Sequence, residues 1–139
     1  MSQHDVVLLL GYNIGDRKKN ILTAVENIEK CIGKVLKQSE LLETKPVEFC
    51  SLNYFLNFAL LIKTSLSPIQ LLNEVKKIEK KMGRQDDTSI IGYFTDRIID
   101  IDIVEYSNLF YKCRRLEIPH LKHLQEREFS KFLIDKIKA

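Results

Sequence analysis

Runs of apolar and β-branched residues predict three long strands. Residues Val6–Leu10 are apolar without interruption, which is typical of a strand buried on both faces. Two further β-prone runs cover Tyr54–Thr64 and Ile98–Val104. The looser pattern of residues 34–43 is compatible with another strand, and residues 109–111 form a short extended stretch. The segments that favour strands are therefore spread along most of the chain.

Apolar residues at helical spacing predict two helices between these strands. The first follows Asp16, a suitable N-cap, and stops at Gly33. The second begins at Ser67-Pro68, where an N-cap is followed by proline at the first helical position, and ends at Gly83. Both segments carry apolar residues three and four positions apart, so each is expected to bury one face.

The order of these elements predicts one α+β domain over residues 1–139. Strand, helix, strand, strand, helix and strand give the ferredoxin-like βαββαβ plan, in which one antiparallel sheet has helices packed on one face. A helical tail is expected from about Leu121. Residues 44–51 and 84–96 are expected to be loops, and the second is predicted to be mobile and functional because long loops in compact domains usually are.

Charge, length and cysteine content narrow the range of functions. The 139 residues include 22 Lys+Arg and 19 Asp+Glu, and the net charge of +3 suits an anionic small molecule but is too small to demand nucleic acid. The longest apolar run is far shorter than the about 20 residues that cross a membrane. Cys31, Cys50 and Cys113 are widely separated, which fits reduced thiols in a cytoplasmic protein better than disulfides or a zinc site.

The most specific feature is the acidic pair within Asp96–Asp102. Because strand side chains alternate, Asp100 and Asp102 are expected on one face and the neighbouring isoleucines on the other. Carboxylates about 6.6 Å apart along a strand can converge on one or two Mg²⁺ ions. The alternative is an edge strand whose polar face meets solvent, although two such acids repel each other and oppose strand propensity.

Basic residues from separate segments form a second candidate site. Arginine is the usual bidentate ligand of phosphate, so arginines brought together by folding would clamp a polyphosphate. Taken singly, each is more simply a solvated charge, and a lone histidine is more often structural than functional. The residues concerned are Arg84, Arg97, Arg114, Arg115, Arg127 and His120.

Phe55 and Asn57 are two residues apart in a predicted strand and so share a face. An aromatic ring beside an amide can stack on a flat heterocycle and hydrogen-bond its edge. From the spacing alone, the simpler interpretation is that Phe55 belongs to the core and Asn57 caps a bulge. Neither a phosphate-binding loop motif nor a Ser-His-Asp or Cys-His arrangement is found in the sequence.

Several short motifs follow one another over nearly the whole chain. They are GYNIGD (11–16), TKP (44–46) with FLN (55–57), TSLSP (64–68) with IE (78–79) and GR (83–84), DRIIDID (96–102), and IPH (118–120) with EREF (126–129). In this order they resemble the motifs of the 6-hydroxymethyl-7,8-dihydropterin pyrophosphokinase (HPPK) family of folate biosynthesis. Each motif is weak alone, but their occurrence in the right order is not expected by chance.

This resemblance implies a reaction and a set of site residues. Members of the family bind ATP with two Mg²⁺ ions and transfer pyrophosphate to the hydroxymethyl group of the pterin, which releases AMP. Carried over to this chain, the resemblance implies that Asp100 and Asp102 hold the metal ions. Arg84 and Arg97 would stabilise the developing charge. The ATP side would be lined by Lys76, Glu79, Arg115, His120 and Arg127, and the pterin side by Thr44, Val47, Phe55, Asn57, Phe94 and Phe129.

Three positions depart from the family pattern, because Lys45 replaces a proline, Lys76 a frequent glutamine and Glu117 a frequent threonine. The loop at 84–97 is also longer, and residues 132–137 stand where the family has a longer segment. One alternative is a catalytically weak or inactive HPPK-like domain that still binds pterin and nucleotide. Another is a ferredoxin-like nucleic-acid binder, although the usual aromatic motif is missing. We expect small-molecule substrates, no nucleic-acid or membrane partner, and a monomer or weak dimer.

Overall fold

The computed structural model describes residues 2–12, 17–44, 55–83, 99–121, 124–125 and 127–138. The elements predicted up to residue 106 are present within these ranges, with bounds that differ by a few residues. None of the helices that the structure describes is long and apolar enough to span a membrane. The elements are β1 (His4–Tyr12), α1 (Arg17–Cys31), β2 (Gly33–Gln38), β3 (Leu42–Thr44), β4 (Phe55–Thr64), α2 (Pro68–Lys81), β5 (Asp100–Tyr106), β6 (Tyr111–Lys112), β7 (Glu117–Ile118) and α4 (Glu128–Lys138).

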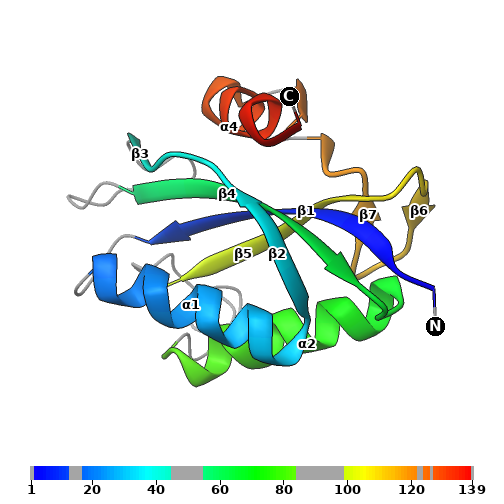
Figure 1. Cartoon of the computed structure of the whole chain (residues 1–139). Coiled ribbons are helices and arrows are strands. Elements are labelled where there is room, and N and C mark those ends of the chain that lie inside the picture. Colours follow the sequence, from blue (N-terminus) through cyan, green and yellow to red (C-terminus); the bar gives the residue numbers. More distant parts are fainter. Residues whose placement is uncertain are drawn as a thin grey trace.

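Five strands form one antiparallel sheet (Figure 1). Their order is β2-β4-β1-β5, and β3 also pairs with β4. β1 lies in the interior of the sheet, where it pairs with β4 along its whole length and with β5 along most of it. β5 is therefore an edge strand. This strand order follows the predicted ferredoxin-like plan, with β3 added to it.

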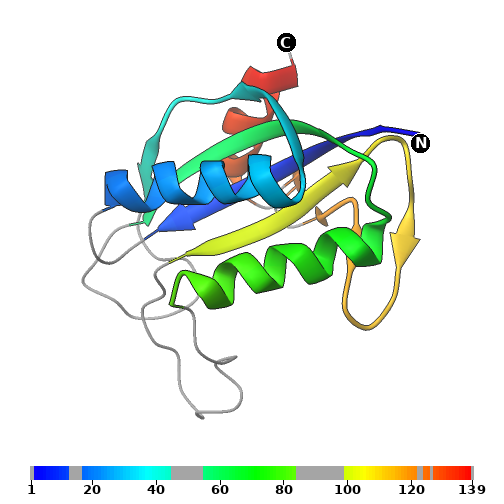
Figure 2. The same cartoon turned by 60° about the horizontal axis from the view of Figure 1, so that its bottom comes forward.

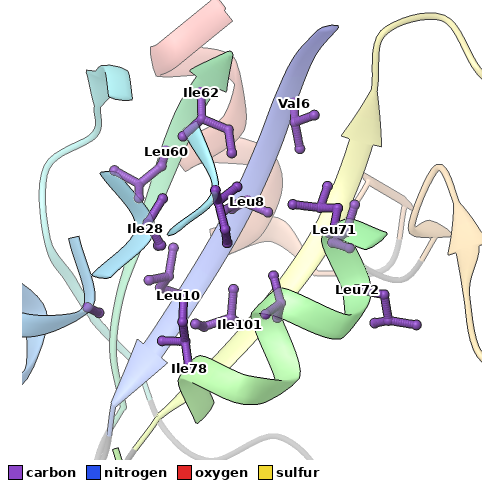
Figure 3. Packing of buried hydrophobic residues seen from close by; sticks show 14 of the residues in the cluster. Val6, Leu8, Leu10, Ile28, Leu60, Ile62, Leu71, Leu72, Ile78 and Ile101 are labelled. Carbon is purple, nitrogen blue, oxygen red and sulfur yellow. The ribbon is translucent and has the colours of Figure 1, made fainter. Parts of the chain in front are cut away.

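α1 and α2 lie side by side over one face of the sheet (Figure 2). Figure 3 shows Leu8 and Leu10 of β1 packed among Ile28 of α1 and Leu71 and Ile78 of α2. All five side chains are buried. Burying an aliphatic side chain completely stabilises the folded state by about 1.5–3 kcal/mol relative to leaving it exposed. With so many side chains buried together, this layer forms the main core of the protein.

α4 covers the opposite face of the sheet (Figure 1). Leu133, Ile134 and Ile137 of α4 are buried against Val7 and Leu9, the β1 residues that alternate with those facing α1 and α2. The two helices of the predicted plan therefore pack on one face, and α4, the predicted helical tail, adds a cover on the other face. The prediction that this strand is buried on both faces is confirmed. An unbroken apolar run in a strand presents an apolar row on each face, and each row needs a cover.

α2 begins and ends at the residues that its sequence predicts. The Ser67 hydroxyl accepts a hydrogen bond from the Gln70 N–H at 3.3 Å, and the Gln70 side chain accepts one from the Ser67 N–H at 3.0 Å. This reciprocal pair is a capping box. Beyond the helix, Gly83 has a φ of 105°, a conformation that residues with a side chain rarely adopt.

A short hairpin, in which β6 pairs with β7, follows β5. Two residues beyond its end, the chain is held to the edge of β5, because the His120 N–H donates to the Val104 carbonyl at 2.8 Å. The hairpin and α2 therefore flank the outer edge of β5.

Replacing Ser67 by Ala removes one half of the capping box. We expect the free energy of unfolding to fall by about 1 kcal/mol and Tm to fall by about 3 °C, as measured by thermal denaturation. Ser65→Ala is the control, because Ser65 is also exposed but precedes the helix. Equal losses in the two variants would show that the capping box adds no stability.

Candidate active site

β5 carries the two acidic residues of the predicted metal site. The isoleucines that flank them are buried in the layer under α1 and α2, whereas Asp100 and Asp102 are partly exposed. Asp100 lies opposite Gly11 of β1, and Asp102 lies opposite Leu9. Because directly opposed residues share a face of the sheet, both carboxylates project from the face on which α4 packs.

A row of three residues crosses the sheet at this end. Gly11 is the register partner of both Asn57 in β4 and Asp100 in β5. With neighbouring strands about 4.8 Å apart, the backbones of Asn57 and Asp100 are roughly 10 Å apart, and glycine places no side chain between them. The Asn57 amide donates to the Leu42 carbonyl of β3 at 3.3 Å. The Asn57 amide, the Gly11 backbone and the Asp100 carboxylate therefore form a surface suited to a flat polar ligand.

Other residues of the predicted pterin side lie near this row. Thr44 and Phe55 are register partners in β3 and β4, two residues along β4 from Asn57. Phe129, in the first turn of α4, packs against the apolar cluster that contains Leu9. It therefore lies on the face of the sheet that also carries Asn57 and Asp100.

The donor set of β5 can be tested against the predicted Mg²⁺. Among the described residues, no group of three or more His, Cys, Asp or Glu side chains could enclose a metal ion. Asp100 and Asp102 offer carboxylate oxygens on one strand face. Mg²⁺ takes one or two protein carboxylates and completes its shell with water and phosphate oxygens, so the two aspartates fit this ion. Structural zinc, which needs four nitrogen or sulfur ligands, does not fit them.

A cavity of about 380 Å³ opens at the outer edge of β5, between α2 and the β6–β7 hairpin. This volume lies within the range of about 300–1,000 Å³ that is usual for small-molecule sites. Basic side chains predominate among its charged lining, which favours an anionic ligand. The charged and titratable lining residues are Lys76, Arg114, Arg115, His120, Asp102 and Glu117, with Cys113 beside them.

Arg115 connects the two outer walls of this cavity. Its guanidinium donates to the Asn73 side-chain oxygen of α2 at 2.8 Å, so the hairpin and the helix are linked side chain to side chain. Glu117, the acidic departure from the family pattern, pairs with Lys112 on the same hairpin at 3.5 Å. Because this pair is exposed, it adds little stability, but it balances part of the acidic charge beside the cavity.

Lys76 and Glu79 lie one turn apart on α2 but have different surroundings. Lys76 lines the cavity and is half exposed, and its ammonium lies 3.4 Å from Glu79 Oε1. Glu79 is 2% exposed and is not among the residues that line the cavity. Its other oxygen, Oε2, accepts a hydrogen bond from the Ile101 N–H at 2.8 Å. The structure thus places Glu79 between α2 and β5, behind Lys76.

Several predicted site residues are not tested by this geometry. Arg84, Arg97, Val47 and Phe94 lie outside the described residues. Arg127 immediately precedes α4, where its carbonyl accepts a hydrogen bond from the Lys131 N–H at 3.2 Å, and it does not line the cavity described above. The roles assigned to these five residues stay predictions.

Sequence reasoning did not single out Asn73 or Cys113 as site residues. Asn73 lies three residues before Lys76, a spacing that places both on one helix face and is the signal that could have found it. Cys113 belongs to the β6–β7 hairpin, whose strands of two residues carry no periodic pattern. A backbone hydrogen bond from Arg115 is the main cause of a lowered pKa of the Cys113 thiol, and the Tyr111 hydroxyl also lowers it.

A carboxylate pair next to a basic cavity is the arrangement of proteins that bind a nucleotide polyphosphate together with a divalent metal ion. The site therefore fits the class of enzymes that transfer phosphoryl groups. A comparison with known proteins identifies the family. Residues 7–139 match the family model of 7,8-dihydro-6-hydroxymethylpterin-pyrophosphokinase (HPPK), and the chain belongs to this family.

Two curated relatives carry the corresponding enzyme name. The 2-amino-4-hydroxy-6-hydroxymethyldihydropteridine pyrophosphokinase of Aquifex aeolicus is 40% identical over 124 residues, which cover 89% of this chain and 74% of that protein. The protein of the same name from Porphyromonas gingivalis is 33% identical over 134 residues, which cover 95% of this chain and 89% of that protein. The predicted family is confirmed, and with it the transfer of pyrophosphate from ATP to hydroxymethyldihydropterin in folate biosynthesis.

Solved structures support the fold. Wild-type Plasmodium falciparum HPPK-DHPS with SDX-DHP matches with a TM-score of 0.65 at 20% identity, over 98% of this chain. This chain spans 37% of that longer chain. The predicted ferredoxin-like α+β class is therefore confirmed, and α4 adds a cover on the second face of the sheet.

Replacing Asn73 by Ala releases the Arg115 guanidinium from α2. We expect the KM for ATP to rise about three- to tenfold with little change in kcat, because a contact made equally in the ground and transition states affects binding alone. Steady-state kinetics at saturating pterin measure both constants. Lys77→Ala is the control, because Lys77 lies on the same helix and pairs with Glu74 instead. A fall in kcat at unchanged KM would contradict this role of Asn73.

The lowered pKa of the Cys113 thiol predicts fast alkylation. A larger share of the thiol is thiolate at neutral pH, so its reaction with iodoacetamide should exceed that of the same cysteine in the urea-unfolded chain. The rate should also reach its plateau at a lower pH than in the unfolded chain. Peptide mass spectrometry after labelling between about pH 6 and pH 9 measures this difference.

ATP with Mg²⁺ should slow the labelling of Cys113, because the thiol lines the cavity. Cys31 is the internal control, since it is exposed but does not line the cavity. Equal protection of the two cysteines by ATP would show that the nucleotide does not occupy this cavity.

Proposed function

We propose that this chain transfers pyrophosphate across the end of β5, with ATP at the edge of the strand and the pterin on the outer face of the sheet. The observation that carries this arrangement is the position of Asp102, which lines the cavity and also forms the carboxylate pair with Asp100. From this pair, the row through Gly11 to Asn57 continues across the sheet. A single strand would thus join the ATP side to the pterin side.

Asp100 and Asp102 would hold Mg²⁺, two ions in the arrangement that the family resemblance implies. When bound with ATP, such ions would supply positive charge that offsets the charge of the phosphates. The chain itself contributes two carboxylates on one strand face, held in register by β1.

The cavity would hold the nucleotide through its basic lining. Lys76, Arg115 and His120 meet there from α2, the hairpin and the segment after β7, and Asn73 sets the position of Arg115. Arg84, Arg97 and Arg127 would complete the phosphate contacts, in the roles that the sequence predicts.

The pterin would lie over the row that contains Gly11. Asn57 would hydrogen-bond the polar edge of the ring with Thr44 and Val47, as the family resemblance implies. The ring would be sandwiched by Phe55 and Phe129, with Phe94 contributed by the 84–97 loop. In support, Phe129 and Asn57 lie on the same face of the sheet.

Catalysis would then follow from positioning and charge. The hydroxymethyl oxygen of the pterin attacks the β-phosphorus of ATP, the bond from that phosphorus to the bridging oxygen of the α-phosphate breaks, and AMP leaves. This step needs no protein nucleophile, because holding two reactants in line and neutralising their charge supplies most of the rate enhancement.

We also propose that residues 1–139 act as one domain, as a monomer or weak dimer in the cytoplasm, with no nucleic-acid or membrane partner. The small net charge of +3 supports the part of this proposal that concerns nucleic acid. The exposed Cys31 and Cys113, which form no disulfide, support a location in the cytoplasm. Sedimentation at micromolar concentration would measure the oligomeric state.

Replacing Asp100 or Asp102 by Asn keeps the size of the side chain and removes its charge. We expect Mg²⁺-dependent AMP formation from ATP and the pterin to fall by at least about 10²-fold, while Tm stays within a few degrees of the parent value. Asp5→Asn is the control, because Asp5 is an exposed residue of β1 that pairs with Lys63 at 3.8 Å.

Calorimetry on the parent chain separates the alternatives. Binding of pterin and of a non-hydrolysable ATP analogue without any AMP release from ATP would establish the inactive binding domain instead. Full activity in both aspartate variants would overturn the metal site.

A further inference from the structure

β5 is an edge strand, so alternate backbone N–H groups along it point away from β1. The N–H of Ile101 is one of these groups, and it donates to the Glu79 carboxylate of α2 at 2.8 Å. A side-chain carboxylate therefore takes the place that a carbonyl of a further strand would occupy. In this way α2 supplies a hydrogen-bond acceptor to the open edge of the sheet.

The Glu79 carboxylate is held firmly at this position. It is 2% exposed, and burying a carboxylate is costly unless partners compensate for the lost water. The Ile101 N–H binds one oxygen, and the Lys76 ammonium lies 3.4 Å from the other. These two contacts fix the carboxylate against the β5 backbone.

The position of this hydrogen bond along β5 gives it a consequence for the site. The peptide unit that contains the Ile101 N–H joins Asp100 to Ile101, and the next residue is Asp102. Fixing the plane of this peptide restricts the direction in which the Asp100 and Ile101 side chains leave the strand, and Asp102 follows one residue further along. β1 holds the same stretch from the other edge, through the pairs Gly11↔Asp100 and Leu9↔Asp102. The backbone between the two carboxylates is therefore held on both sides.

We propose that Glu79 is a positioning residue, which holds β5 so that Asp100 and Asp102 keep the spacing and direction needed to bind Mg²⁺. The proposal rests on the metal role proposed for the two aspartates. It assigns Glu79 no contact with the nucleotide, in contrast to the role implied by the family resemblance. The support is that Glu79 lies behind Lys76, and that Lys76 is the residue that lines the cavity.

Two conservative variants separate the reach of the side chain from its charge. Glu79→Gln keeps the length and an oxygen acceptor for the Ile101 N–H, but loses the charge and the ion pair with Lys76. Glu79→Asp keeps the charge, but is one methylene too short to reach the same N–H. Glu74→Gln and Glu74→Asp are the matched controls, because Glu74 lies on the same helix and pairs with Lys77 at 3.3 Å on the surface.

Three measurements on the folded chain decide the outcome. The first is the hydrogen-exchange rate of the Ile101 amide by NMR. The second is the affinity for Mn²⁺ in the presence of a non-hydrolysable ATP analogue, followed by electron paramagnetic resonance. The third is the affinity for the same analogue in EDTA, measured by calorimetry.

The positioning role predicts a specific pattern. Glu79→Asp should speed exchange of the Ile101 amide and weaken Mn²⁺ binding about tenfold, the size usual for loss of a group that orients metal ligands. In Glu79→Gln, the exchange rate of the Ile101 amide and the affinity for Mn²⁺ should both stay within about threefold of the parent values, a smaller change than the loss of a metal-orienting group causes. Neither variant should change the affinity for the analogue in EDTA, and the Glu74 variants should match the parent throughout.

Weaker analogue binding in EDTA with unchanged exchange at Ile101 would overturn the proposal and make Glu79 a nucleotide ligand. If Glu79→Asp does not fold, Glu79→Gln decides alone, because a tenfold loss of Mn²⁺ affinity in a variant that keeps the acceptor contradicts positioning. The proposed function is tested by a different result, because it fails if the parent chain makes no AMP from ATP and the pterin. Exchange and Mn²⁺ binding are measured without turnover, so they test Glu79 in either case.

Discussion

Because Val6–Leu10 is apolar at every position, β1 must be covered on both faces, and this constraint determines the layers around it. α1 and α2 cover one face, and α4 covers the other. The strand must also be paired along both edges, which places β4 on one side and β5 on the other. The polar residues of the site are therefore confined to one end of the sheet and to its outer edge.

β5 can carry a carboxylate pair and border a cavity because the side chains and the backbone groups of a strand point in different directions. Its side chains alternate between the two faces, and its backbone groups point along the plane of the sheet. One face of β5 contributes apolar residues to the core, and the other carries Asp100 and Asp102. The outer edge borders the cavity, and its Ile101 N–H donates a hydrogen bond to the Glu79 carboxylate. Core packing, the carboxylate pair and the border of the cavity thus share seven residues without competing for the same groups.

The features that sequence reasoning predicted are those with a local signature. Ser67-Pro68 and Gly83 define α2 through their own backbone preferences, and the acidic pair in β5 stands out from an otherwise apolar alternation. The face chosen by α4 has no such signature, because an amphipathic pattern shows that a helix is buried but not on which side of a sheet. The hydrogen bond between Asn73 and Arg115 forms only because folding brings two distant segments together, so the local sequence does not predict it. The partner of Glu79 is a backbone N–H, and because every non-proline residue has one, the sequence does not show which of them Glu79 will bind.

The position of β1 in the sheet also has a consequence for the synthesis of this chain. β1 is made first, but its partners β4 and β5 and its second cover α4 are made much later. Such pairings between distant segments form slowly, because a long loop must close before any contact rewards it. On the ribosome, the most apolar strand therefore emerges long before its native neighbours exist. Until then it is the segment most exposed to wrong association, so the strand that organises the native fold is also the main hazard while the chain is incomplete.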